Sequence, residues 1–514
     1  MKERERFLLF LPLLLYGAAL NPYFPPGTYD DIVFYYGARS LAEGGGFQFA
    51  GKYVVDWAPG LSALLAVPMA LGFGSIWAAK LCILLCVGAG LLLAFRYLKA
   101  EGRPRPLITC TLFALLPTGF MMGTKIMTEW PFIALSFLFL GLLRSLDGER
   151  RGLLLAALAG LALGAASLTR WVGVMLGVAV LAQALSRIRA KDFPGFRSVL
   201  PEFTVAAVGA ALFCLWKLKL VYQVGSGAAE PSTYYRGYWY LELFTGSAFS
   251  ALPLRIGDLF FQVSSLGRYF GTDGPAMRGA VWGVCGPLTL WGAARQFRGR
   301  GVLPGDWYAL ATLTLFALLK QNPQVRYLLP VAPFLLSYFL SGLDAALAAP
   351  GRLSPRWRAG LAGAALAAWT VALVALDGHL LFRGNVTGSH AGLCVLASPN
   401  ADAFYKGTWK DMYRAGRFIA EAGSSEAVSV TGQQDKYMLA FSGRSATDFP
   451  PKGGVDFVVE IAPDRLPESA RQGMGLREVG RFGTVVVYRS TSALTSTKGA
   501  PETVALKGSG KDDL

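Results

Sequence analysis

The sequence predicts an α-helical, multi-pass membrane protein with a small α/β domain after its last membrane span. The chain has 514 residues, of which 53% are hydrophobic and only 16% are charged. Its apolar residues gather in runs long enough to cross a bilayer, and its Lys and Arg residues gather in short clusters between those runs. Together these three observations exclude an ordinary soluble globular protein.

The membrane helices are expected where apolar residues continue for the thickness of a bilayer, which takes roughly 17 to 25 residues. By this criterion we expect about eleven spans, several of them shorter than the rule. The expected spans cover residues 7–24, 75–98, 106–124, 130–144, 153–169, 171–186, 199–221, 278–294, 307–320, 327–343 and 358–377.

Two apolar stretches do not fit a simple span. A continuous helix over 153–186 would be roughly 51 Å long, against a hydrocarbon core of about 30 Å, so we expect a bend at Thr169-Arg170-Trp171. The segment 61–73 contains Pro68 and is short for a span, which favours an interfacial or re-entrant helix. A further helix on the membrane surface is expected over 31–42.

The cations predict the topology. Every second connection between spans is basic, as cytoplasmic loops are, and this pattern places the N-terminus in the cytoplasm. The net charge of +16 therefore reflects membrane topology, and nucleic acid is not an expected partner. The exoplasmic parts are then 25–74, 125–129, Arg170, 222–277, 321–326 and everything after about residue 378.

The expected protein is an integral component of the bacterial inner membrane with two domains. Residues 1–20 also suit a signal peptide cleaved near Gly17-Ala18-Ala19, but the loop that follows favours a retained first span. A transmembrane domain is expected over 1–378, an exoplasmic α/β domain over 379–490 and a disordered tail over 491–514. Within the α/β domain we expect a helix over 409–422, strands over 427–431 and 455–461, and a hairpin over 476–489.

Three acidic residues fall on the predicted outer face. Asp30 and Asp31 follow the first span, and Glu129 lies in the short loop before the fourth. Asp30 is equally consistent with a helix N-cap, and Glu129 with a cap or an ion pair to Lys125 at i, i+4. If these acids converge, they can supply a general base and electrostatic stabilisation, or hold a divalent cation such as Mg²⁺ or Mn²⁺ at Asp30 and Glu129.

The same face carries three cations that can bind a lipid phosphate. Lys80 lies near the outer end of the second span, Arg170 at the expected bend, and Arg326 just before the tenth span. Arg binds phosphate oxygens bidentately and Lys binds them as a point charge. The alternative is snorkelling, in which the side chain only reaches the lipid headgroups.

The long outer loop contains a dense aromatic segment with Tyr235, Tyr238 and Trp239. Such rings suit stacking on sugar faces, although an aromatic belt at the membrane interface has the same composition. Signatures of soluble enzymes are absent, since the sequence holds no Walker loop, no nucleophile elbow and only two His residues. This absence argues against a nucleotide-driven pump.

Four segments follow one another on the predicted outer face. They are the acidic pair with Tyr35 downstream, Trp57-Ala58-Pro59-Gly60-Leu61, Thr128-Glu129, and Arg326-Tyr327-Leu328-Leu329-Pro330. By their order and common sidedness, most of residues 1–345 resembles the polyprenyl-phosphate-sugar glycosyltransferases of the GT-C type, which include protein O-mannosyltransferases and the aminoarabinose transferases of lipid A.

The resemblance implies roles for these residues. Asp30 would be the general base, with Asp31 and Glu129 as further acids of the centre, and Arg326 would stabilise the leaving phosphate with Lys80 or Arg170. Many relatives have Lys-Pro-Pro-Leu where this chain has Trp57-Ala58-Pro59-Gly60-Leu61, so the phosphate-side Lys is missing unless Lys52 replaces it. The aromatic candidates for substrate contact are Tyr35, Trp57, Tyr235, Tyr238, Trp239 and Tyr327.

The function expected from the resemblance is transfer of a sugar from a polyprenyl-phosphate donor to a glycolipid, polysaccharide or protein acceptor, on the exoplasmic face and with inversion. A transporter or flippase is the alternative from another class, but it predicts charges buried in mid-helix and a repeated half, and no convincing repeat is visible. A catalytically silent scaffold with the same fold is the third reading.

Overall fold

The protein forms two compact units, Met1–Phe404 and Tyr405–Leu514. The predicted domain boundary lies earlier, between residues 378 and 379. The predicted loop residues Tyr235, Tyr238 and Trp239 and the predicted tail over 491–514 fall outside the described residues. The computed structural model describes residues 3–25, 29–49, 52–55, 57–146, 152–190, 199–226, 275–318, 325–348, 354–383, 392–394, 400–422, 428–431, 435–442, 446–448, 456–462 and 466–490.

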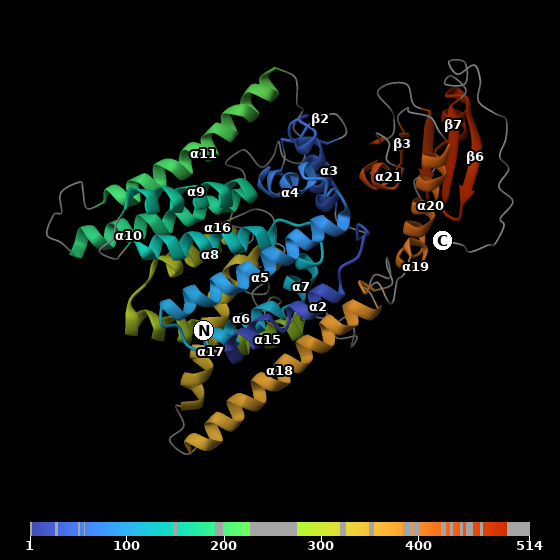
Figure 1. The fold of residues 1–514 in the computed structure, drawn as a ribbon. Coiled ribbons are helices and arrows are strands. Elements are labelled where there is room, and N and C mark those ends of the chain that lie inside the picture. The colour runs from blue at the N-terminus through green and yellow to red at the C-terminus, as the bar shows by residue number, and fades with distance from the viewer. Residues whose placement is uncertain are drawn as a thin grey trace. The chain divides into compact units, whose positions relative to one another are not determined.

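The first unit is helical, and each predicted span overlaps at least one of its helices (Figure 1). Within the described residues, five helices are long and apolar enough to cross a membrane, or six if the bent pair α6 and α7 forms one span. The helices are α1 (Glu3–Phe10), α2 (Leu13–Ala18), α3 (Asp30–Ala42), α4 (Gly60–Ala70), α5 (Ile76–Ala100), α6 (Pro106–Ala114), α7 (Pro117–Gly123), α8 (Glu129–Ser145), α9 (Leu153–Thr169), η1 (Trp171–Met175), α10 (Leu176–Ala190), α11 (Leu200–Gly225), α15 (Pro275–Arg300), α16 (Pro304–Leu318), η5 (Val325–Val331), α17 (Ala332–Ala348), α18 (Pro355–Arg383) and α19 (Ala401–Phe404).

Three of the predicted spans are interrupted, and proline accounts for two of the breaks. The span predicted over 7–24 divides into α1 and α2 at Pro12, and that over 106–124 divides into α6 and α7, with a 63° bend before Pro117. Proline has no N–H to continue the hydrogen-bond ladder of the preceding helix. The span predicted over 327–343 begins with the 3₁₀ turn η5. The bend predicted at Arg170 is confirmed, since this residue is extended between α9 and η1.

The helices predicted over 31–42 and 61–73 are present as α3 and α4, which pack against each other (Figure 1). They are joined through a short antiparallel hairpin of β1 (Gln48–Phe49) and β2 (Lys52–Tyr53). Gly60 opens α4 at a close contact with α9, because a Cβ atom there would lie 2.7 Å from the carbonyl oxygen of Leu168. This close approach fixes the segment that carries Trp57.

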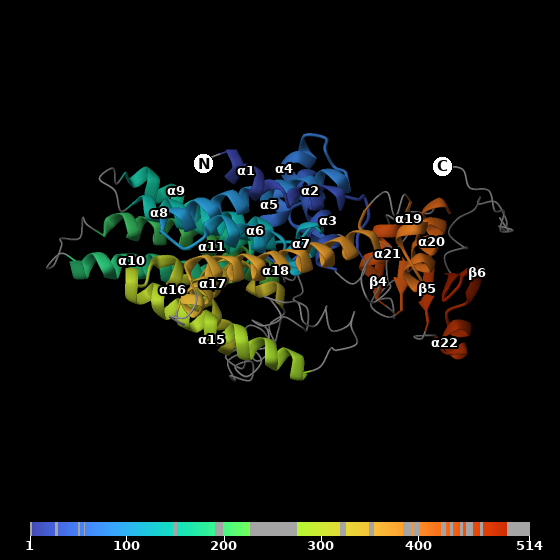
Figure 2. The same cartoon turned by 90° about the horizontal axis from the view of Figure 1, so that it is seen from below.

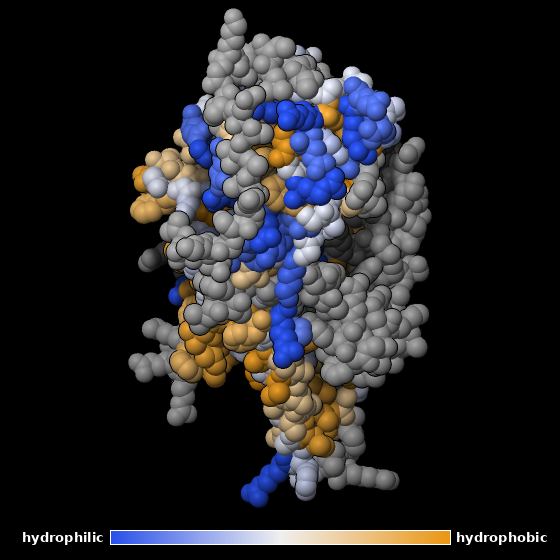
Figure 3. All heavy atoms as spheres, turned by 90° about the vertical axis from the view of Figure 1, so that its right-hand side faces the viewer, coloured by the Kyte–Doolittle hydropathy of each residue, from blue (hydrophilic) through white to orange (hydrophobic). Residues whose placement is uncertain are grey.

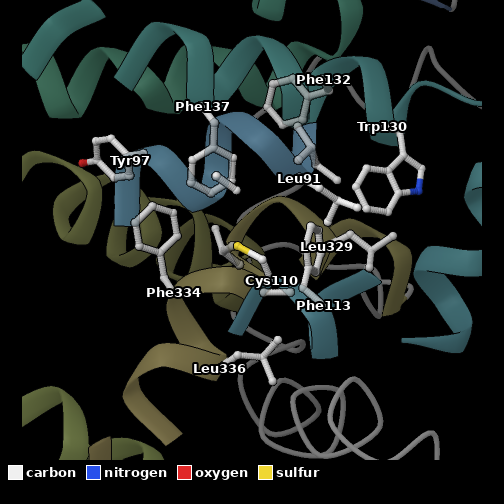
Figure 4. Packing of buried hydrophobic residues seen from close by; sticks show 14 of the residues in the cluster. Leu91, Tyr97, Cys110, Phe113, Trp130, Phe132, Phe137, Leu329, Phe334 and Leu336 are labelled. Atoms are coloured by element: carbon white, nitrogen blue, oxygen red, sulfur yellow. The ribbon is translucent and has the colours of Figure 1, made fainter. Parts of the chain in front are cut away.

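The core of the first unit is rich in aromatic rings (Figure 4). Phe137 of α8 and Phe334 of α17 stack with ring centroids 5.6 Å apart, and Tyr97 of α5 packs against both rings. Ring pairs of this kind add about 0.5–1.5 kcal/mol beyond the area they bury. These ring contacts therefore hold α5, α8 and α17 together.

Small residues allow two pairs of helices to cross closely. A Cβ atom on Gly292 of α15 would collide with the carbonyl oxygen of Tyr338 in α17, and one on Gly342 of α17 would collide with that of Leu288. Gly164 of α9 likewise leaves room for the Leu212 side chain of α11. Close crossings through small residues are typical of membrane helices.

The outer surfaces of several helices are apolar, as a lipid-facing surface requires. Leu85, Leu154 and Val371 have more than half of their surface exposed. Figure 3 shows apolar side chains, in orange, gathered in the lower half of the face that it draws. Because five helices also pass the length criterion, the chain is an integral membrane protein.

A buried ionic network lies beyond the C-terminal end of α5. Arg103 pairs with Glu101 at 2.8 Å and with Asp306 at 2.6 Å, and these side chains are almost fully buried. The Arg103 guanidinium also lies over the Phe334 ring. Since α5 has 25 residues, this network is separated from the start of α5 by roughly 37 Å.

The second unit is an α/β domain with a five-stranded sheet in the order β4-β3-β5-β7-β6 (labelled in Figures 1 and 2). The strands β3, β4 and β5 are parallel, whereas β7 is antiparallel to β5 and β6. The predicted helix and strands are confirmed, but β4, α21 and α22 were not predicted. The elements are α20 (Thr408–Glu421), β3 (Val428–Val430), α21 (Asp435–Ser442), β4 (Ala446–Asp448), β5 (Phe457–Ile461), α22 (Glu468–Gly473), β6 (Leu476–Phe482) and β7 (Val485–Ser490).

Candidate active site

Charged side chains from six parts of the first unit gather around the N-terminal ends of α3 and α8. They come from α3, α5, the connection between α7 and α8, the first residue of α8, the break between α9 and η1, and η5. Ion pairs and electrostatic contacts connect all of them. We call this group the charged cluster, and its members are Asp30, Asp31, Lys80, Lys125, Glu129, Arg170 and Arg326.

Asp30 is held by two donors from distant parts of the chain. Trp57 Nε1 donates to its Oδ1 at 3.1 Å, and Arg326 Nη1 donates to its Oδ2 at 3.2 Å. The side chain keeps 26% of its surface exposed. The N-cap of α3 is Tyr29, and Asp30 is the first helical residue, so the capping interpretation of Asp30 is wrong.

Glu129 is the buried acid of the charged cluster. Its carboxylate, with no exposed surface, lies 2.7 Å from Arg170 Nη1 and 3.9 Å from Arg326 Nε. Arg170 also donates to Thr128 Oγ1 at 3.0 Å. Glu129 therefore pairs with two arginines, and neither a cap nor an ion pair with Lys125 describes it. Arg326 connects the two acids, since one guanidinium contacts both Asp30 and Glu129.

Tyr327 supports both arginines from one ring. The guanidinium carbons of Arg170 and Arg326 each lie 5.3 Å from its ring centroid, which is cation–π distance. Phe316 of α16 stacks on the same ring, with centroids 6.0 Å apart. The ring thus keeps two positive charges close together that would otherwise repel each other.

Lys80 points into the protein, so the snorkelling interpretation is wrong for this residue. It is fully buried, and its ammonium donates to Asn21 Oδ1 at 2.8 Å and to the carbonyl oxygen of Tyr23 at 2.7 Å. Asn21 donates in turn to the carbonyl oxygen of Leu393. Arg170 and Arg326 are also mostly buried and paired, which excludes simple snorkelling for them as well.

Asp31 lies behind Asp30 and has no exposed surface. Its Oδ1 accepts the Ile32 N–H at 3.0 Å, while its Oδ2 has no hydrogen-bond partner among the described residues. Burial raises the pKa of Asp31 to about 7, although the nearby charges of Lys125 and Lys80 act in the opposite direction. Asp31 thus differs from its partly exposed neighbour Asp30 in environment.

Comparison with solved structures identifies the fold. No protein-family model matches the chain, and no curated protein matches its sequence. The structure is similar to that of ArnT from Cupriavidus metallidurans bound to undecaprenyl phosphate, with a TM-score of 0.58 and 14% identity over 94% of this chain and 97% of ArnT. The chain has the GT-C fold.

Two further structures share this GT-C fold. The archaeal oligosaccharyltransferase AglB from Archaeoglobus fulgidus, in complex with an inhibitory peptide and a dolichol-phosphate, matches with a TM-score of 0.53 and 13% identity over 95% of this chain and 74% of AglB. The arabinofuranosyltransferase AftD from Mycobacteria matches with a TM-score of 0.50 and 16% identity over 95% of this chain and 40% of AftD. The predicted GT-C fold is therefore confirmed.

The GT-C fold of this chain does not bring every predicted site residue into the charged cluster. Lys52 is exposed on β2 and forms no ion pair within the part of the chain that the structure describes. Tyr35 is bound elsewhere, since its hydroxyl donates to the carbonyl oxygen of Gly74 at 2.5 Å. Trp57 and Tyr327, in contrast, both contact the charged cluster.

The acids are poorly arranged for a metal ion. In the described ranges, no group of three or more His, Cys, Asp or Glu side chains is placed to hold one. Asp30 and Glu129, the pair predicted as possible ligands, both face the Arg326 guanidinium. A divalent cation between them would lie against this positive charge, so the residues present do not fit such an ion.

Sequence reasoning missed three polar residues of the site. The sequence indicates Lys125 only as a possible partner of Glu129 and Thr128 only as part of the Thr128-Glu129 segment, and it gives Asn21 no role. All three lie in or beside predicted outer loops, close in sequence to an acid or to the first span. This closeness in sequence narrows the choice of residues. It does not reveal their hydrogen bonds, because each bond joins segments that are distant in the sequence.

An open apolar groove of about 370 Å³ runs along α10 and α16 of the GT-C fold. Met175 of η1 and Leu315 and Leu318 of α16 line one part of it, and Trp307 lines another. Arg170 directly precedes η1, and Phe316, which stacks on Tyr327, lies between Leu315 and Leu318. The residues that line the groove do not include a member of the charged cluster, but η1 and α16 contribute to both surroundings.

Proposed function

We propose that this protein is a membrane glycosyltransferase that moves a sugar from a polyprenyl-phosphate donor to a hydroxyl or amine acceptor. The observation that carries the proposal is the exposure and fixed orientation of the Asp30 carboxylate. It is the one exposed carboxylate among the three acids of the charged cluster, and it is oriented by Trp57 and Arg326. An accessible, fixed carboxylate beside paired arginines suits a general base next to an anionic leaving group.

In the proposed reaction the acceptor oxygen or nitrogen attacks the anomeric carbon of the sugar. The new bond to that carbon forms as the bond from the carbon to the phosphate oxygen breaks, which inverts the configuration. Asp30 takes the acceptor proton, and the electron pair of the broken bond leaves with the lipid phosphate. Trp57 keeps Oδ1 in place while the proton is transferred.

The arginines are placed to stabilise the charge that develops on the leaving phosphate. Arg326 and Arg170 lie on the same Tyr327 ring and have fixed side chains. Such preorganised donors are worth more in a partly buried site than in water, and removing one typically slows a reaction by about 10²–10³-fold. Glu129 lowers the cost of holding the two cations so close together.

The apolar groove along α10 and α16 supports a lipid-linked donor. A polyprenyl tail in this groove would lie along Met175 of η1, the short helix that directly follows Arg170. Among proteins with the same fold, ArnT was solved with undecaprenyl phosphate and AglB with a dolichol-phosphate. The proposed mechanism uses no metal step, because Arg326 already occupies the position between Asp30 and Glu129.

The predicted topology places this reaction on the exoplasmic face. The connections that hold Asp30, Lys125, Glu129 and Arg326 alternate with the basic connections of the chain. The acceptor is then a glycolipid, polysaccharide or protein of the cell envelope, as expected from the sequence.

Asp30→Asn tests the proposal. Cells with the wild-type protein, with this variant and with no protein are compared for envelope glycolipids, polysaccharides and glycoproteins by mass spectrometry. We expect one sugar modification to be present only with the wild type. Glu43→Gln, which alters an exposed acid of the same helix, is the control and should keep the modification. A normal modification with Asp30→Asn at equal protein levels would refute the role of Asp30. A profile that does not depend on the protein at all would refute the transferase.

A further inference from the structure

Lys125 differs from the other cations of the charged cluster in forming no hydrogen bond or ion pair at all within the described residues. Lys80 donates to Asn21 and to Tyr23, and the two arginines pair with Asp30 and Glu129. Among the residues that the structure describes, no hydrogen bond or ion pair is formed by the Lys125 ammonium. All three of its N–H donors are thus available.

The Lys125 side chain is nevertheless mostly buried. Lys125 exposes only 9% of its surface, and every residue from Met122 to Trp130 around it is buried. Removing an unpaired ammonium from water costs several kcal/mol. A buried cation without a partner is therefore unusual in a finished scaffold, and it is a feature expected of a group that binds a ligand.

The electrostatic surroundings keep this cation in place without binding it directly. Burial lowers the pKa of Lys125 and the charge of Arg326 acts in the same direction, whereas Asp31, Glu129 and Asp30 favour the charged form. All three carboxylates lie beyond ion-pair distance, so they favour a positive charge at this position while leaving its donors unused. The result is an ammonium next to both the general base and the proposed phosphate-binding arginine.

We propose that Lys125 binds the phosphate of the lipid-linked donor and is its principal lysine contact. An anionic oxygen is the ligand that matches an ammonium with free donors, and lysine binds phosphate as a point charge. Lys80 already donates to Asn21 and Tyr23, and Lys52 is exposed on the hairpin. This inference rests on the proposed function, because it takes the donor to be a lipid phosphate.

The test compares two lipids that differ only in the phosphate. Binding of undecaprenyl phosphate and of undecaprenol to the purified full-length protein in detergent is measured, and their affinity ratio reports recognition of the phosphate. For Lys125→Met we expect this ratio to fall at least about tenfold, with unchanged affinity for undecaprenol. Lys125→Arg should keep most of the ratio, and Lys52→Met should keep all of it.

The outcomes separate the two proposals. A wild-type protein that binds both lipids equally would refute the lipid-phosphate donor, and with it the proposed function. A wild-type preference that Lys125→Met retains would refute only the role of Lys125. If Lys125→Met does not fold, acetylation of the wild type answers the same question by peptide mass spectrometry. Undecaprenyl phosphate should protect Lys125 and undecaprenol should not, and equal modification with both lipids would overturn the proposal.

Discussion

Arg326 Nη1 lies 3.2 Å from Asp30 Oδ2, although the two residues are 296 positions apart in the sequence. The same guanidinium approaches Glu129, so a single side chain joins the two acids of the site. Both contacts depend on the breadth of the guanidinium group, which an ammonium does not have. The arginine at this position is therefore central to the geometry of the site.

Arg326→Ala should weaken binding of undecaprenyl phosphate by at least about tenfold, because a fixed cation beside the phosphate is lost. Arg326→Lys keeps the charge, but the lysine cannot reach both carboxylates. Its affinity for undecaprenyl phosphate should therefore lie between those of the wild type and Arg326→Ala. Arg39→Ala, which removes an exposed arginine of α3, is the control. Equal affinities in wild type and Arg326→Ala would show that Arg326 only holds Asp30 and Glu129 in position.

Replacing Asn21 should destabilise the first unit through Lys80. In Asn21→Ala the buried ammonium loses one of its two acceptors, which costs about 1–3 kcal/mol or more for a charged group. The expected result is a melting temperature in detergent that is lower by a few degrees. Ser145→Ala, whose hydroxyl is exposed and bonded within its own helix, should melt like the wild type.

The crossing of α15 and α17 should not tolerate even a methyl group. Gly292→Ala and Gly342→Ala each place a Cβ against a backbone carbonyl that cannot move aside, and overpacking of this kind costs about 1–3 kcal/mol or more. Gly283→Ala on the same α15 meets open space and should be neutral or stabilising. Melting temperatures of the three variants measure the difference, and similar values would contradict the close crossing.

Asp31 should make stability depend on pH. Its folded-state pKa of about 7 is above the ordinary value, so the folded protein holds a proton that the unfolded chain releases, and this contribution to stability is lost as the pH rises from about 4 to 7. Asp31→Asn cannot lose that proton. It should therefore raise the melting temperature relative to wild type more at pH 8 than at pH 5. A difference that does not change with pH would contradict the prediction.

Removing metal ions should not stop transfer. The Arg326 guanidinium lies between Asp30 and Glu129, where a divalent cation would otherwise be held. We expect EDTA, followed by addition of Mg²⁺ or Mn²⁺, to leave the rate of release of polyprenyl phosphate unchanged. Loss of activity with EDTA and its recovery with either ion would require a different arrangement of these side chains during the reaction.

The sequence predicted which residues share the site better than it predicted their contacts. Asp30, Glu129, Arg170 and Arg326 lie in connections that alternate with basic ones, and this sidedness was sufficient to group them. Lys80 was misjudged because a lysine near a helix end has two directions available. The inward direction of the Lys80 side chain becomes clear only from the structure, in which its ammonium donates to Asn21.

The same limit applies to the helices. Hydropathy located each apolar segment, but Pro12 and Pro117 divide two of the predicted spans, and their effect depends on packing around the break. The break at Arg170, in contrast, could be predicted from the sequence. The apolar stretch over 153–186 is too long for a single span and therefore requires a bend. In the second unit the short strand β4 is three residues long, which is too short for an alternating pattern to be recognised.

The separation of Asp30 and Arg326 along the chain has a consequence for biosynthesis. At about 5–20 residues per second, the ribosome needs roughly 15 to 60 s to add the 296 positions between them. During this interval α3 has already been synthesised, but Asp30 does not yet have Arg326 as its ion-pair partner. A nascent chain released before η5 is synthesised would thus carry Asp30 with the Trp57 hydrogen bond but without its arginine.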